Sequence, residues 1–183
     1  ALEQDGRVGL VRVRQEGSSL LVEMEGDLEA GAVVAAVRQA FHLDLDLTAF
    51  QQHMAAVDPV MAALARRYTG AKPVAPFSHW ESLAWAIIGQ QVNISFAYSL
   101  KESLVRLCGV NYQGLPAFPG PEAVAALRYE QLQAEKYSRR KAEYLIDAAR
   151  AVVEGRLDLP ALVALPYDEA VAALTRIRGV GRW

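Results

Sequence analysis

LTRIRGVGRW, residues 174–183, places a Gly-Val-Gly turn directly after a segment with helical spacing and among three arginines. Glycine lets the backbone approach a phosphate closely and accepts positive φ angles. With a second helix after the turn, the free amides and the dipole of that helix form an anion site without a large net charge. A glycine at a helix end is also a common plain terminator, so the turn alone is a weak signal.

The composition describes an ordinary globular chain that is not coated in positive charge. Its 183 residues are 52% hydrophobic and 22% charged, with a net charge of -2, which fits one domain of good size. Acidic residues are frequent near the start, whereas four basic residues cluster later, at Lys136, Arg139, Arg140 and Lys141. Together with the arginines of the last stretch, this asymmetry permits a local basic face on the C-terminal side.

The chain carries no pattern of a membrane protein or of a secreted one. No apolar run approaches the ~20 residues that span a bilayer, and the first residues lack a basic start followed by an apolar stretch. We therefore expect a cytoplasmic protein with no membrane partner.

Cysteine and histidine usage argues against several kinds of metal site. Cys108 is the only cysteine, which excludes an internal disulfide, a multi-cysteine zinc site and a cysteine-ligated iron–sulfur cluster. Its position at a probable helix end favours a small buried apolar role. His42, His53 and His79 share no metal-ligand spacing.

Hydrophobic periodicity changes character near residue 27. Residues 8–24 contain two β-rich runs joined by residues 15–18, which predicts a hairpin with one wet face. From Asp27 onward the spacing is helical. We therefore predict a mainly α fold, a helical bundle with a small N-terminal β-hairpin, divided into residues 1–26 and 27–183.

Caps and stops set the expected helix ends. Ser78 with Glu81 predicts a capping box, and Ser138 predicts the start of a long helix that Gly155 ends. Asp168 or Tyr167 is expected to start the last helix, with Asp168 as its cap. The predicted helices cover residues 29–41, 47–57, 59–68, 79–90, 94–109, 121–127, 129–135, 139–154 and 168–177. The long helix is expected to bury one apolar stripe, formed by Ala142, Leu145, Ile146, Ala149, Val152 and Val153.

Four stretches taken together resemble the helix–hairpin–helix DNA glycosylase superfamily, and within it the bacterial 3-methyladenine DNA glycosylase II branch. They occur in order and at natural spacing within residues 41–183: FSHWESLAWAIIGQQVNISFAYSL (77–100), GLPAFPGPEAVAAL (114–127), KYSRRKAEYLIDAARAVVEG (136–155) and LTRIRGVGRW (174–183). On this resemblance residues 8–24 look like a remnant of the N-terminal β domain of that branch.

The resemblance implies DNA contacts for the hairpin and for the GQQV segment. Backbone amides of Gly179, Val180 and Gly181, together with Arg182, would bind phosphate. Gln91 stands where the family places a wedge that fills the gap left by a flipped nucleotide, although some members carry leucine there. The carbonyls of Thr175, Ile177 and Val180 would hold a sodium or potassium ion, and no cofactor is required.

Trp183 follows the hairpin arginine where the related lyase branches carry a lysine. Tryptophan forms no Schiff base but offers a π face to a cationic alkylated purine, so the resemblance implies a base pocket and hydrolysis without strand cleavage. The family's catalytic aspartate lies a few helical turns beyond the hairpin. We therefore expect the catalyst beyond residue 183, none within the chain, and a C-terminally shortened glycosylase domain. Asp168 reads better as a cap, and Glu143 and Asp147 match no catalytic position.

The expected function is a base excision repair glycosylase that flips 3-methyladenine-type purines out of double-stranded DNA and hydrolyses the N-glycosidic bond. It would act as a monomer in the cytoplasm, at the nucleoid. The main alternative is a non-catalytic helix–hairpin–helix DNA-binding module. Two others are a structural bundle whose turn is incidental and a glycosylase for oxidised purines, whose members usually carry the lysine.

Overall fold

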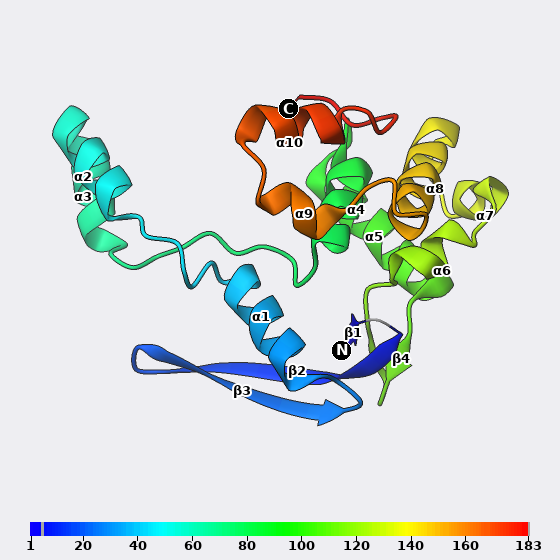
Figure 1. Ribbon diagram of the computed structural model, residues 1–183, viewed down its shortest axis with the longest axis horizontal. Coiled ribbons are helices and arrows are strands. Elements are labelled where there is room, and N and C mark those ends of the chain that lie inside the picture. Colours follow the sequence, from blue (N-terminus) through cyan, green and yellow to red (C-terminus); the bar gives the residue numbers. More distant parts are fainter. Residues whose placement is uncertain (5, 183) are drawn as a thin grey trace.

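A computed structural model describes residues 1–4 and 6–182, and Trp183 lies outside the described residues. The fold is mainly helical with a small sheet near the N-terminus (Figure 1), which confirms the predicted fold class. The helices are α1 (Ala30–Ala40), α2 (Thr48–Val57), α3 (Pro59–Arg67), α4 (His79–Gly89), α5 (Ile94–Cys108), α6 (Pro121–Ala125), α7 (Tyr129–Ala134), α8 (Arg139–Val153), α9 (Leu159–Val163) and α10 (Tyr167–Leu174).

The predicted hairpin is present and belongs to a three-stranded sheet. The strands are β1 (Leu2–Gln4), β2 (Arg7–Glu16) and β3 (Ser19–Gly26), paired antiparallel in that order. β1 was not predicted, because three residues are too few to show a period-2 pattern. The sheet is tied to the helical part, since Glu3 accepts a hydrogen bond from the amide of Gly120 at 3.2 Å.

Three short elements had no counterpart in the expectations. β4 (Asn111–Tyr112) and β5 (Leu115–Pro116) form a small antiparallel pair, and α9 begins after Asp158, whose carboxylate accepts from the amide of Ala161 at 3.0 Å. The Asp-Leu-Pro sequence at this point carries a usable signal, an N-cap residue with proline in the first turn. No helix of the described residues is long and apolar enough to cross a membrane.

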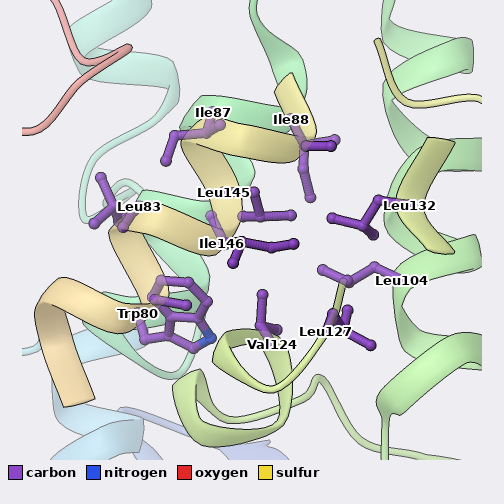
Figure 2. Packing of buried hydrophobic residues seen from close by; sticks show 14 of the residues in the cluster. Trp80, Leu83, Ile87, Ile88, Leu104, Val124, Leu127, Leu132, Leu145 and Ile146 are labelled. Atoms are coloured by element: carbon purple, nitrogen blue, oxygen red, sulfur yellow. The ribbon is translucent and has the colours of Figure 1, made fainter. Parts of the chain in front are cut away.

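The core lies where α8 packs against α4 and α6 (Figure 2). Leu145 and Ile146 of α8 are fully buried among Ile87 and Ile88 of α4 and apolar side chains of α5, α6 and α7. The predicted stripe is correct except at its end, because Val153 is 48% exposed. The helical period keeps Val153 on the face of Ala142, so its exposure means that the neighbouring elements end before the last turn of α8.

The predicted caps are confirmed in part. The hydroxyls of Ser78 and Ser138 accept hydrogen bonds from the amides of Glu81 and Lys141, at 3.0 and 3.2 Å. The capping box is only half formed, since the Glu81 carboxylate instead binds the Lys101 ammonium at 2.6 Å. The expectation that Asp168 caps α10 is wrong. Pro166 is the N-cap residue and no side chain caps this helix, so Asp168 lies in the first turn, where a carboxylate favours the helix dipole.

The pair α2 and α3 lies apart from the other helices in Figure 1, joined to α4 by residues 68–78. Asp58 separates the two helices and caps α3, because its carboxylate accepts from the amide of Val60 at 2.7 Å. α2 buries none of its residues. The Gly-Val-Gly turn near the C-terminus is therefore positioned by α4, α8 and α10, and not by α2 and α3.

Candidate nucleic-acid interface

The Gly-Val-Gly turn follows α10 and runs toward α8 (Figure 1). The amide of Val180 donates to the carbonyl of Ile177 at 3.1 Å, and both side chains pack against the main core. Gly181 and Arg182 are exposed. The turn therefore holds one apolar side against the protein and presents Gly181 and Arg182 to solvent.

Gly179 is required on two grounds. Its φ is +91°, a conformation that other residues rarely adopt. A Cβ at this position would also overlap ring carbons of Tyr144 on α8. The turn thus rests with its bare backbone on an aromatic ring, and any side chain at residue 179 would lift it.

Arg178 anchors the turn and is not a free phosphate ligand. Its guanidinium binds the carboxylates of Glu143 at 3.0 Å and Asp147 at 2.9 Å and lies 5.4 Å from the centre of the Tyr144 ring. The hydrogen bond to Asp147, followed by the charges of both carboxylates, raises the pKa of Arg178. The expected arginine patch is accordingly smaller. Arg176 is exposed, and Arg182 is 76% exposed with Asp168 at 3.9 Å.

The turn between α4 and α5 lies beside the Gly-Val-Gly turn. The side-chain amide of Gln90 donates to the carbonyl of Gly179 at 2.8 Å. Gln91, which comes next, is exposed and has φ +54°, in the left-handed region that few residues other than glycine occupy. The structure therefore brings together two segments, Gln90–Gln91 and Gly179–Arg182, that lie far apart in the sequence.

Lys141 lies beneath this pair of turns. It is only 9% exposed, and its ammonium donates to the carbonyls of Ile88 and Gln90, the latter at 2.8 Å. Burial lowers the pKa of Lys141. Lys141 was expected in an exposed basic cluster, and that is wrong because residue 141 precedes the buried Leu145 by one helical turn and shares its face.

The sequence-predicted residues have different outcomes. Gln91 follows Gln90, which binds the segment Gly179–Arg182 at Gly179, and Trp183 lies outside the described residues. Sequence reasoning missed Gln90, Tyr144 and Lys141. Only Lys141 carried a signal, its spacing from the apolar stripe of α8.

The carbonyls expected to hold a metal ion fit that role in their chemistry. Among the described residues, the carbonyls of Thr175 and Val180 accept no hydrogen bond and that of Ile177 accepts one. Neutral carbonyl oxygens are suitable ligands for a hard cation. No cluster of His, Cys, Asp and Glu that could hold a metal ion occurs within residues 1–4 and 6–182.

The other reactive groups near the core have structural surroundings. Glu143 and Asp147 bind Arg178, so neither carboxylate is free beside the turn. Burial raises the pKa of the Cys108 thiol to about 11, and its sulfur lies 3.5 Å from the carbonyl of Leu104. A thiol with so high a pKa is protonated at neutral pH and is a poor nucleophile, as the sequence predicted.

Comparison with known proteins places this turn in a family. Residues 84–181, which include the second half of α4, all of α8 and the Gly-Val-Gly turn, match the HhH-GPD superfamily base excision DNA repair protein family. The chain belongs to the HhH-GPD superfamily. The match ends at Gly181, within the glycine turn that follows α10 and docks on α8, and residues Gly179–Arg182 are called the hairpin below.

Relatives within the HhH-GPD superfamily are similar along most of the chain. DNA-3-methyladenine glycosylase of Bacillus subtilis (strain 168) is 35% identical over 155 residues, covering 82% of this chain and 51% of that protein. YfjP of the same organism is 31% identical over 182 residues, covering 98% of this chain and 63% of YfjP. The chain thus spans less than two thirds of the length of either relative.

A solved HhH-GPD structure agrees with the arrangement. The 3-methyladenine DNA glycosylase from Archaeoglobus fulgidus is 29% identical and superposes with a TM-score of 0.75, covering 98% of this chain and 62% of that one. Because 98% of this chain is covered, the likeness extends beyond the helices to the N-terminal sheet.

Proposed function

We propose that this chain binds duplex DNA through Gln91 and the hairpin Gly179–Arg182, as part of a glycosylase that removes 3-methyladenine-type purines. The observation that carries the proposal is the bare backbone of the hairpin, docked on Tyr144 beside Gln91. The relatives named for 3-methyladenine supply the substrate class.

The hairpin would act through phosphate. The amides of Gly179 and Gly181 donate no hydrogen bond among the described residues, and together with Arg182 they offer donors to a phosphate oxygen. This contact carries no base sequence. The net charge of -2 is compatible with a contact of this kind, because the donors are local. Gln91, held exposed at the adjacent turn, would enter the duplex from the same side.

An alkali cation would support the hairpin. The carbonyls of Thr175, Ile177 and Val180 would hold it, and the ion would supply positive charge near the bound phosphate. The residues themselves position the backbone amides and Arg182.

Base removal would follow nucleotide flipping, since the sugar carbon is inaccessible within the stacked duplex. Water would then form a bond to the sugar carbon as the bond to the base breaks, and the base would leave with the bonding electrons. We propose Trp183 as the π face that holds a cationic base. Glu143 and Asp147 are not proposed as the group that activates water, because Arg178 binds both.

Base release and strand cleavage, measured together on the product of the whole reading frame, test this function. We expect release of 3-methyladenine from alkylated duplex DNA, no release of 8-oxoguanine and no strand cleavage. Trp183→Ala should lower release of the cationic base about 2- to 30-fold, the range of a cation–π contact, and leave duplex affinity nearly unchanged.

Other outcomes separate the competing functions. Duplex binding without base release would favour the non-catalytic DNA-binding module, and strand cleavage would contradict hydrolysis without lyase chemistry. Sedimentation of the protein with and without a short duplex checks the proposed monomer. A cytoplasmic location at the nucleoid is proposed because the substrate would be found there.

A further inference from the structure

Lys141 is a buried cation that binds the end of a helix. Its ammonium donates to the carbonyls of Ile88 and Gln90, and within residues 6–182 no carboxylate lies within ion-pair distance of it. A positive charge at a helix C-terminus is favourable, because the last carbonyls have no partners inside the helix. The hydrogen bonds of Lys141 to these carbonyls thus offset the free-energy cost of burying its charge, and they fix the residue at which α4 ends.

Gln90 links that helix end to the hairpin. Its carbonyl accepts from Lys141, and its side-chain amide donates to the carbonyl of Gly179. Gln90 is therefore bound by Lys141 of α8 through its backbone carbonyl and binds the hairpin through its side chain. Tyr144, one turn along α8 from Lys141, supports the opposite side of Gly179.

We propose that Lys141 and Gln90 are positioning residues that join the α4–α5 turn and the hairpin into one DNA-binding unit. The proposal rests on the proposed DNA binding. Neither side chain needs to touch DNA. They set the distance between Gln91 and the hairpin amides. One duplex can therefore place a phosphate at the hairpin and receive the side chain of Gln91 at the same time.

These hydrogen bonds explain why a substitution of Lys141 should change the local stability of the backbone at Val180. Without the ammonium, two carbonyls at the end of α4 lose a charge-assisted donor. The turn that carries Gln90 is then free to shift, and the bond to Gly179 is lost with it. Among the described residues Lys141 forms no hydrogen bond or ion pair with the hairpin, so an effect there must pass through Gln90.

The first readout is amide hydrogen exchange in the DNA-free protein, followed by NMR at Val180. Lys141→Met should raise exchange at Val180 about tenfold relative to Leu104 in the core, and Gln90→Ala about 2- to 10-fold. Lys141→Arg keeps a cationic donor and should restore most of the protection. Unchanged exchange at Val180 in Lys141→Met would overturn the coupling.

Two matched controls isolate the path. Lys72 also donates to a backbone carbonyl, that of Leu43 at 2.7 Å, and Gln15 also donates to a glycine carbonyl, that of Gly17 at 3.1 Å. Lys72→Met and Gln15→Ala should leave exchange at Val180 within about twofold of the parent protein. An increase in the controls as large as in Lys141→Met would show a general effect and contradict the proposal.

Duplex affinity supplies the second readout and separates the two levels of the argument. In the parent protein, Gln91→Ala and Arg182→Ala should lower affinity non-additively, and in the Gln90→Ala background their effects should add. Additive effects in both backgrounds would overturn the joined unit. No duplex binding by the parent protein would contradict the proposed function, and the exchange result would then decide the coupling alone.

Discussion

Gly179→Ala is expected to lower affinity for duplex DNA about tenfold or more, a loss of at least ~1.4 kcal/mol. The methyl group would overlap the Tyr144 ring, so the hairpin must rise off α8. That movement breaks the bond from Gln90 to the Gly179 carbonyl and moves the amides away from their position beside Gln91. Fluorescence anisotropy with a labelled duplex at fixed salt measures the effect.

Gly70→Ala is the matched control. Gly70 also has positive φ, +83°, but a Cβ there would meet nothing within 4 Å. Both variants carry the cost of an alanine at positive φ, and only Gly179→Ala carries the clash. Gly70→Ala should therefore bind DNA within about twofold of the parent protein. Equal affinity of the two variants would remove the docked hairpin from the interface.

Leu145→Ala is expected to lower the free energy of unfolding by about 2–5 kcal/mol. Leu145 is fully buried in the core in Figure 2, where Ile87 and Ile88 of α4 lie near it. Truncation removes buried methyl groups and leaves a cavity that the surrounding helices cannot close completely. Urea unfolding followed by circular dichroism measures the loss.

Val153→Ala is the control for this substitution. Val153 lies on the same helix and in the same predicted apolar stripe, but it is 48% exposed. Its truncation should change the free energy of unfolding by no more than about 0.5 kcal/mol. A loss as large as that of Leu145→Ala would mean that the last turn of α8 is buried by elements that do not cover it in this structure.

The sequence predicted most of the helices because their signals are local. Apolar spacing and the caps Ser78 and Ser138 act within one or two turns, and the structure keeps them. Ser138 even starts the helix that carries Lys141 and Tyr144. By contrast, β1 depends on pairing with β2. The sequence of a three-residue strand is too short to predict such a tertiary contact.

The sequence predicted the Gly-Val-Gly turn of the candidate site but not the side chains that support this turn. Glycine spacing and family resemblance located the hairpin, because these depend on consecutive residues. The bond from Gln90 to Gly179 joins residues 89 positions apart, and no local pattern encodes it. Arg178 was misjudged for the same reason, since its partners Glu143 and Asp147 come from another helix.

The central claim is that the hairpin contacts DNA phosphate, and the salt dependence of duplex affinity tests it most directly. Arg182 is exposed beside one carboxylate, Asp168, and Arg14 on the sheet is likewise exposed beside one carboxylate, Glu16. Arg182→Ala should reduce the slope of log affinity against log salt by about 1, as for one lost phosphate contact, whereas Arg14→Ala should leave the slope unchanged. Equal slopes for the parent protein and Arg182→Ala, at unchanged affinity, would contradict a phosphate contact at the hairpin.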